Sequence, residues 1–234
     1  MRLSDRTVRL GLKPMAFLAA LGPAAWLVWA GLGELGWYGH PGHFGANPLS
    51  DITNETGIWT LRFLCITIAI TPFRRLTGWN AAIKFRRMTG LFAFFYGTLH
   101  FLTYVVVDRL AGLDFTDGIV SLTTVRDLAK SVAGDVYKRP FITIGFTALT
   151  LMVPLAATST AAMIRRLGKK WQTLHRLVYA SAVLGVVHYW WLVKADVRRP
   201  QTYAAVVGLL LAFRVVWARM HARPKQAARA VAAR

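Results

Sequence analysis

Three histidines in this sequence lie inside apolar stretches of helix length. His100 is in the segment GLFAFFYGTLHFLTYVVV, and His175 and His188 are both in WQTLHRLVYASAVLGVVHYWWLVK. A hydrocarbon layer offers no water to satisfy an imidazole, so a polar side chain at membrane depth is a functional candidate by default. For any one of these histidines taken alone, an interhelical hydrogen bond explains the residue as well as metal ligation does.

The positions of the histidines along their helices add a second argument. His100 lies about 18 Å from the start of an apolar span over residues 88–107, and His188 lies about 21 Å from the same side. His175 lies about 20 Å below His188, near that starting surface. Neutral imidazoles on opposed helices can ligate a heme iron from both sides. The sequence therefore predicts an outer station at His100 and His188 and an inner station near His175.

The spacing within the last of these segments does not fit one straight helix face. Thirteen residues of ideal helix separate His175 from His188 and rotate the side chain by about 220° after whole turns. Either the helix is locally over- or under-wound, or each histidine approaches its cofactor from a different flank. Three glycines are available to let a flat macrocycle approach the backbone: Gly90, Gly97 and Gly185.

Four arginines are candidate partners for cofactor carboxylates. Arg62 and Arg214 lie within apolar spans, each a few residues from an end, and can extend to the interface or meet a propionate. Arg86 and Arg87 lie next to the inner station. We interpret this last pair first as a topology signal and second as a contact to a cofactor.

The composition is that of a polytopic membrane protein. Hydrophobic residues make up 55% of the 234 residues and charged residues 17%, and the formal net charge is +19. A nucleic-acid-binding protein would not separate its basic residues by stretches long enough to cross a hydrocarbon layer of about 30 Å. Because Cys65 is the only cysteine, this chain alone forms neither an intramolecular disulfide nor a thiolate-held iron–sulfur cluster.

We predict an all-α fold, a bundle of six transmembrane helices forming a single domain over residues 1–234. A short amphipathic helix is expected around Leu122, Val125, Leu128 and Val132, between the third and fourth spans. The first span follows four basic residues, so a cleaved signal peptide is the alternative to an uncleaved helix, which we favour. The predicted spans are residues 15–35, 57–73, 88–107, 141–161, 174–193 and 202–218.

The distribution of basic residues predicts the orientation. Nineteen Lys and Arg lie in one set of segments: the N-terminal tail, residues 74–87, residues 165–176 and the tail from residue 219. The segments on the other side, which are the stretch between the first span and residue 57 and residues 108–139 and 194–199, hold eight. Loops rich in Lys and Arg remain on the cytoplasmic side. We therefore expect a multi-pass protein of the bacterial inner membrane with both termini in the cytoplasm and the outer station toward the periplasm.

Three longer motifs resemble a known family. The segments RRMTGLFAFFYGTLHFLTY (86–104), TSTAAMIRRLGKKWQTLHRLVY (158–179) and HYWWLVK (188–194) resemble the MsrQ family, also called YedZ, the membrane heme subunit of the periplasmic methionine sulfoxide reductase system. The resemblance extends over nearly the whole chain. More broadly, the sequence is similar to the ferric-reductase-like transmembrane domain shared with NADPH oxidases.

This resemblance implies a b-type cytochrome with one or two hemes. It would pass electrons from a quinol or a cytoplasmic flavin reductase to a periplasmic molybdopterin reductase subunit, without itself reducing the sulfoxide. The resemblance also implies FMN, and it places the heme ligands at His100, His188 and His175. The wider superfamily has a further histidine where this chain has Arg86 and Arg87. The second ligand of an inner heme therefore stays open between Met88, His221, water and no inner heme at all.

The sequence also bears on alternative functions: an NADPH oxidase, another heme b subunit, and a non-redox transporter or scaffold. A self-contained NADPH oxidase would need a nicotinamide-binding domain after the sixth span, but about sixteen residues follow it and no G-x-G-x-x-G motif occurs. We therefore expect a separate electron donor. A ferric-reductase-like or other heme b subunit with a different acceptor remains an alternative, as does a non-redox transporter or scaffold whose histidines only join helices.

Overall fold

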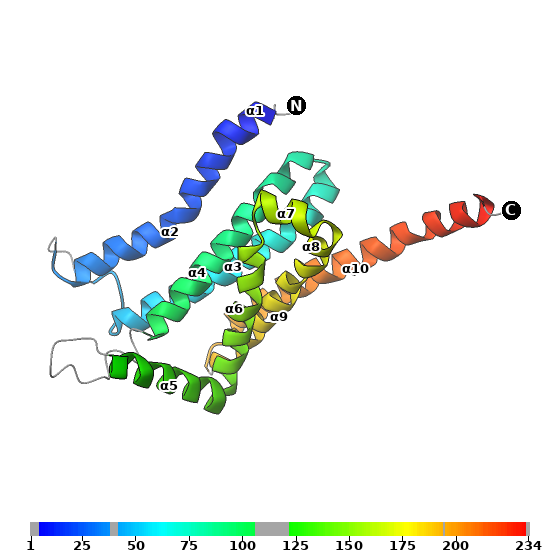
Figure 1. The fold of residues 1–234 in the computed structure, drawn as a ribbon. Coiled ribbons are helices and arrows are strands. Elements are labelled where there is room, and N and C mark those ends of the chain that lie inside the picture. Colours follow the sequence, from blue (N-terminus) through cyan, green and yellow to red (C-terminus); the bar gives the residue numbers. More distant parts are fainter. Residues whose placement is uncertain (1–4, 38–41, 106–121, 194, 233–234) are drawn as a thin grey trace.

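The computed structural model describes residues 5–37, 42–105, 122–193 and 195–232, and these form helices joined by turns, with no strand among them. The predicted all-α class is therefore confirmed. The N-terminal part consists of α1 (Asp5–Thr7), the π-helical turn η1 (Val8–Leu12) and α2 (Lys13–Glu34). Helix α2 lies apart from the bundle along much of its length and bends midway (Figure 1).

The first helix pair consists of α3 (Pro48–Thr77) and α4 (Arg86–Tyr104), joined by the 3-10 turn η2 (Asn80–Phe85). Helix α3 begins nine residues before the predicted start at residue 57, because its first turns are polar and belong to no apolar run. The side-chain oxygen of Asn47 caps this helix by accepting a hydrogen bond of 3.1 Å from the amide of Ser50. Pro48 follows at the first helical position, which needs no amide donor.

The second helix pair consists of α6 (Pro140–Ala157) and α9 (Leu177–Leu192), connected by the short helices α7 (Ala161–Leu167) and α8 (Lys169–Leu174). Gly168 turns the chain between α7 and α8 with a φ of 51°, a value that favours glycine. The predicted single helix from residue 174 is wrong at its start, because a turn at His175 and Arg176 separates α8 from α9.

Helix α5 (Leu122–Lys138) confirms the expected amphipathic helix. Leu128 and Val132 are half-buried, whereas Val125 is 52% exposed. Asp135 is buried, accepts a hydrogen bond from the Tyr104 hydroxyl of α4 and pairs with Arg139 at 3.5 Å. These contacts fix α5 across one end of the bundle (Figure 1).

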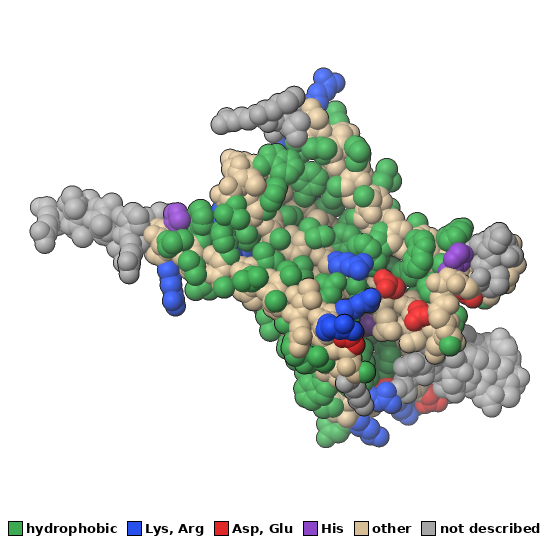
Figure 2. Space-filling model, turned by 180° about the vertical axis from the view of Figure 1, so that it is seen from behind, with side chains coloured by type: hydrophobic (Ala, Val, Ile, Leu, Met, Phe, Trp, Pro, Cys, Tyr) green, Lys and Arg blue, Asp and Glu red, His purple; other side chains and the backbone are tan. Residues whose placement is uncertain are grey.

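The core lies around α3, which packs chiefly against α4, while α6 packs chiefly against α9. Buried residues from α3, α4, α6 and α9 form one continuous apolar cluster, whose members include Leu61, Phe63, Leu64, Ile68, Phe92, Ala93, Tyr96, Met152, Leu155, Val178, Ala182 and Val186. Hydrophobic side chains also cover much of the outer surface (Figure 2). Such a surface suits lipid better than water.

Within the described residues, four helical segments are long and apolar enough to cross a membrane: Val8–Glu34, Pro48–Thr77, Pro140–Ala157 and Arg198–His221. The last belongs to α10 (Arg198–Ala232). The third and fifth predicted spans correspond to α4 and α9, which are not among these four. Helix α4 opens with two arginines, and α9 has only 16 residues. The predicted residues 106 and 107 of the third span lie outside the described part of the chain.

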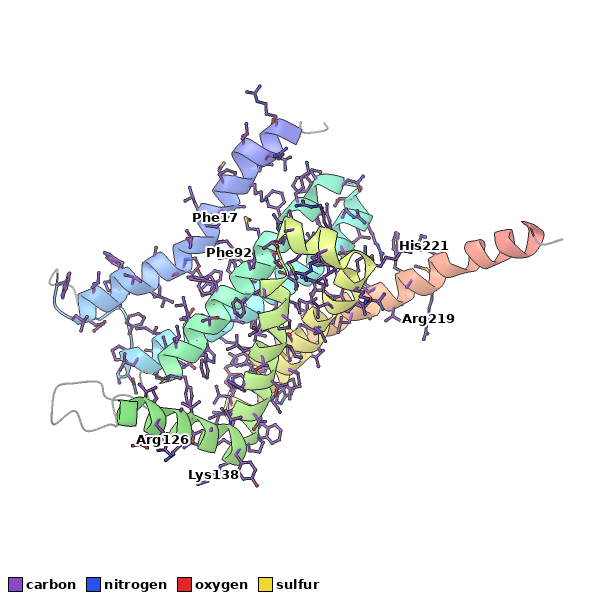
Figure 3. All side chains as sticks on the ribbon, viewed as in Figure 1. Phe17, Phe92, Arg126, Lys138, Arg219 and His221 are labelled. Carbon is purple, nitrogen blue, oxygen red and sulfur yellow. The ribbon has the colours of Figure 1, made fainter. Side chains whose placement is uncertain are left out.

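The start of the N-terminal helix, the turn η2 and the helices α7 and α8 lie at one end of the bundle, and α5 lies at the other (Figure 1). Three of the four basic segments that the sequence grouped on one side thus lie at one end of the bundle in their described parts. The fourth, the tail from residue 219, lies on the part of α10 that extends away from it (Figure 3).

Candidate functional site

Two of the predicted site histidines face each other across the two helix pairs. His100 comes from the C-terminal half of α4 and His188 from the C-terminal half of α9. Their ring centres are 6.1 Å apart, and the ring planes are inclined by 75°. The expectation that these imidazoles share one level is confirmed.

Each of these rings is held by a backbone carbonyl of the neighbouring helix. The Nδ1 atom of His100 lies 2.8 Å from the carbonyl oxygen of Thr53 in α3, and that of His188 lies 2.7 Å from the carbonyl oxygen of Phe141 in α6. A carbonyl only accepts, so Nδ1 carries the proton in both rings and Nε2 keeps its lone pair. This is the tautomer in which a histidine binds a metal through Nε2.

The distance between the rings fits two ligands of one iron. With a metal–nitrogen distance of about 2 Å and about 1 Å from nitrogen to ring centre, two imidazoles on opposite sides of one metal have centres about 6 Å apart. The observed separation is 6.1 Å. The distance between the ring centres is therefore compatible with two ligands on opposite sides of one metal ion.

His175 belongs to a different site at the other end of the bundle. It ends α8, and its ring stacks on Trp171 with ring centres 3.8 Å apart. Its Nδ1 lies 3.1 Å from the Trp171 carbonyl oxygen, and its Nε2 lies 3.5 Å from the hydroxyl of Ser159. Because His175 lies in the turn before α9, the rotation expected for thirteen residues of continuous helix does not apply to it.

His175 lines a cavity of about 610 Å³, whose wall is cationic on the side of the loops. Arg86 and Arg87, at the start of α4, line it as well, so the structure brings together three of the predicted site residues. Three further cations in this wall were not predicted as site residues: Arg9, Lys13 and Lys84. They come from η1, α2 and η2, segments whose positions relative to His175 only the fold reveals.

The two side chains considered as second ligands at the inner station lie elsewhere. Met88 lines a separate apolar cavity of about 540 Å³ between α2 and the first helix pair. His221 is exposed and stacks on Trp217 with ring centres 4.3 Å apart. It lies on the part of α10 that extends away from the bundle (Figure 3). Neither residue lines the cavity next to His175.

The other candidates have local partners. The guanidinium of Arg62 lies 4.4 Å from the ring centre of Trp59, and that of Arg214 lies 4.7 Å from the ring centre of Tyr179. Arg214 also donates to the carbonyl of Ile68 at 3.4 Å. Between α2 and α3, the ring of His43 packs on a tryptophan of α2, while His40 lies outside the described residues.

The glycines closest to the paired imidazoles are not the predicted ones. Gly97 and Gly185 contact leucines of the opposite helix pair, and Gly90 contacts Thr67. The rings instead pack on Gly57 of α3 and Gly145 of α6. The sequence carried a signal for them, because Gly57 and Gly145 are separated by the same 88 positions as His100 and His188.

Comparison with known proteins identifies the family. Residues 56–186 match the family model described as ferric reductase like transmembrane component. A relative from Ralstonia nicotianae is 54% identical over 177 residues, 74% of this chain and 74% of its own length. A relative from Herminiimonas arsenicoxydans is 48% identical over 210 residues, covering 88% and 85% of the two chains.

A third relative, from Bordetella pertussis, is 47% identical over 206 residues, with 87% of this chain and 88% of its own covered. All three are named protein-methionine-sulfoxide reductase heme-binding subunit MsrQ. The chain thus belongs to the MsrQ family, within the ferric-reductase-like transmembrane proteins.

Proposed function

We propose that this protein is a transmembrane heme b electron-transfer subunit in which His100 and His188 are the axial ligands of one heme. The observation that carries the proposal is the facing pair of imidazoles, with centres 6.1 Å apart and each Nδ1 on a backbone carbonyl. The heme would supply a one-electron redox centre whose potential depends on its axial ligands and its burial. The names of the relatives support heme as the cofactor.

The protein's own residues orient the ligands and exclude water. The carbonyls of Thr53 and Phe141 fix the tautomer of the rings and increase the electron donation of Nε2. The helices that carry the two rings, α4 and α9, also contribute to the buried apolar cluster of the bundle, so the half-buried rings lie on elements with low-dielectric packing. Such surroundings disfavour a change in net charge and so influence the potential of a centre held there.

The cavity next to His175 is proposed as the inner cofactor site. Its cations, Arg86 and Arg87 among them, suit a planar group with anionic arms, whether the propionates of a second heme or the phosphate of FMN. In this proposal, His175 ligates or contacts the ring system, and Arg86 and Arg87 bind its anionic groups. Electrons would enter here from a quinol or from a cytoplasmic flavin reductase.

The acceptor is proposed to be a separate periplasmic molybdopterin subunit that reduces methionine sulfoxide. The names of the relatives support the coarser part of this proposal, a protein-methionine-sulfoxide reductase as the partner. The proposal requires six membrane spans, with α4 and α9 crossing alongside the four clearly apolar segments. It also requires both termini in the cytoplasm of a bacterium and the His100–His188 end toward the periplasm. Reporter fusions at the C-terminus and between residues 105 and 122, before α5, would test this orientation directly.

The heme assignment is tested by the reduced-minus-oxidised visible spectrum of the purified full chain. We expect the sharp α-band of a low-spin b heme, and we expect His100→Ala and His188→Ala each to remove the outer heme and its share of that band, which is the whole band if the chain holds one heme. The matched controls are His43→Ala and His221→Ala, which replace histidines packed on surface tryptophans. A full α-band, with the wild-type number of hemes per chain, in both ligand variants would disprove the assignment.

The number and kind of cofactors are tested on the same sample. Pyridine hemochrome quantification gives hemes per chain, and fluorescence of the released flavin gives FMN per chain. One heme with stoichiometric flavin would assign the inner cavity to FMN, and two hemes without flavin would assign it to a second heme. No spectrum in the wild type would favour the scaffold alternative.

A further inference from the structure

Each of the paired imidazoles packs directly on a glycine. A Cβ atom at Gly57 would lie 3.0 Å from Nδ1 and 3.1 Å from Cε1 of His100. A Cβ atom at Gly145 would lie 2.7 Å from Nδ1 and 2.8 Å from Cε1 of His188. These distances are shorter than van der Waals contact. A Cβ atom at Gly145 would therefore require the ring or the backbone to shift, and one at Gly57 would require a smaller adjustment.

The same glycines leave the carbonyl oxygens of Thr53 and Phe141 accessible to the imidazole rings. In an α-helix, the carbonyl of one residue points toward the amide four residues later. Thr53 precedes Gly57 by four residues, and Phe141 precedes Gly145 by four residues. A carbonyl oxygen has two lone pairs, so it can accept from an imidazole as well as from the helix. Without a Cβ on the later residue, the ring can reach that second lone pair.

The two arrangements are copies of one another. In both, 47 residues separate the histidine from the residue whose carbonyl it contacts. The glycines of the histidine helices follow the same relation, because Gly97 faces Leu149 and Gly185 faces Leu61, each across the two pairs. The pair α3 and α4 is thus related to the pair α6 and α9 by an approximate two-fold arrangement centred on the histidines.

We propose that Gly57 and Gly145 are positioning residues that set the tautomer and the relative angle of the two imidazole planes. This inference rests on the proposed heme ligation by His100 and His188. The ring planes are inclined by 75°. Near-perpendicular axial imidazoles give a ferric low-spin heme a highly anisotropic EPR signal, whereas near-parallel planes give a rhombic one. The glycines thereby control a property that can be measured separately from folding.

The test uses the purified full chain with its heme and the variants Gly145→Ala and Gly57→Ala. We expect the wild type to show the highly anisotropic signal. Gly145→Ala should lose that signal or convert it to a rhombic one, with a loss of about tenfold or more in heme affinity, as is typical when a partner that orients a metal ligand is removed. Both variants should also shift the midpoint potential of the heme. Gly57→Ala should change the EPR signal and the midpoint potential in the same direction as Gly145→Ala but by less, because its clash is milder.

Gly185→Ala is the matched control for packing. Its Cβ would lie 3.0 Å from a methyl carbon of Leu61, so it introduces a comparable clash on the helix of His188 without touching an imidazole. Gly208→Ala, where a Cβ meets nothing within 4 Å, is the control for the substitution itself. Both controls should keep the EPR signal and the potential of the wild type.

The outcomes separate the inference from the function it rests on. Unchanged EPR signals and affinities in Gly57→Ala and Gly145→Ala would overturn the positioning role, as would an equal change in Gly185→Ala. If Gly145→Ala cannot be recovered folded from the membrane, Gly57→Ala decides. A wild type without any low-spin heme signal would instead refute the proposed heme ligation, and this inference with it.

Discussion

Replacing Tyr96 with phenylalanine removes the one oxygen atom through which the Tyr96 side chain of α4 forms hydrogen bonds to the backbone of α2. The Tyr96 side chain of α4 is fully buried, and its hydroxyl donates to the carbonyl of Ala20 at 2.8 Å and accepts from the amide of Ala24 at 3.1 Å. In a continuous helix the amide of Ala24 would donate to the carbonyl of Ala20 directly. The hydroxyl is thus inserted into the hydrogen-bond ladder of α2 next to Pro23, a residue type that bends helices. Figure 1 shows that α2 bends midway.

The two hydrogen bonds of Tyr96 add to apolar contacts between α2 and the bundle. One of these is between Phe17 and Phe92, whose ring centres are 5.2 Å apart (Figure 3), whereas Leu18 is 67% exposed. A net contribution of about 0.5–1.5 kcal/mol per hydrogen bond, at the lower end in membranes, gives about 1–2 kcal/mol for the two bonds. That energy changes the ratio of docked to detached α2 by about five- to thirty-fold.

Two assays measure this effect. Reversible unfolding in mixed micelles of increasing SDS fraction should show Tyr96→Phe destabilised by about 1–2 kcal/mol, and hydrogen–deuterium exchange should rise in α2 but not in α3. Tyr137→Phe is the control, because the Tyr137 side chain is 89% exposed. Equal stability of Tyr96→Phe and wild type, together with unchanged exchange in α2, would refute the view that this hydroxyl holds the helix in place.

The other predictions concern the inner cavity and the first helix pair. His175→Ala should remove any inner heme or flavin while the α-band of the outer heme persists, and cofactor quantification per chain checks this; loss of the outer band would contradict two separate sites. The double variant Arg86→Gln with Arg87→Gln should lower the affinity for the inner cofactor and make its retention less sensitive to salt, because ions screen the attraction between arginines and anionic groups. A salt titration of cofactor release measures both effects. Thr67→Val removes the 3.0 Å hydrogen bond to the Thr89 hydroxyl between α3 and α4 and should cost about 0.6–1.7 kcal/mol in SDS unfolding; no measurable change would show that this bond contributes little.

The histidine pair illustrates how far sequence reasoning reached. Counting residues at 1.5 Å of rise placed His100 and His188 at one level, and the structure confirms it. Helical rise is a local property, so depth follows from the chain alone. The direction in which a side chain points across a helix interface depends on packing, and no pattern in the sequence predicted the 75° between the ring planes.

His175 shows where the same reasoning failed. The continuous apolar run suggested one helix from residue 174, but the chain turns at His175 before α9 begins. Hydropathy indicates which residues prefer lipid. It does not reveal a break in a helix when the backbone groups at the break find hydrogen-bond partners nearby, as the amide of Tyr179 does by donating to the carbonyl of Arg176.

By itself, the sequence determined the helical class, the apolar segments, the basic end of the molecule and the level of the paired histidines, because hydrophobic length, charge and helical rise are read along the chain. Only the tertiary structure decided what meets between helices. It placed Gly57 and Gly145 under the imidazoles and gathered Arg9, Lys84 and His175 around one cavity. Contacts between segments distant in sequence depend on how helices cross and which small residues permit close approach, and the folded packing fixes both.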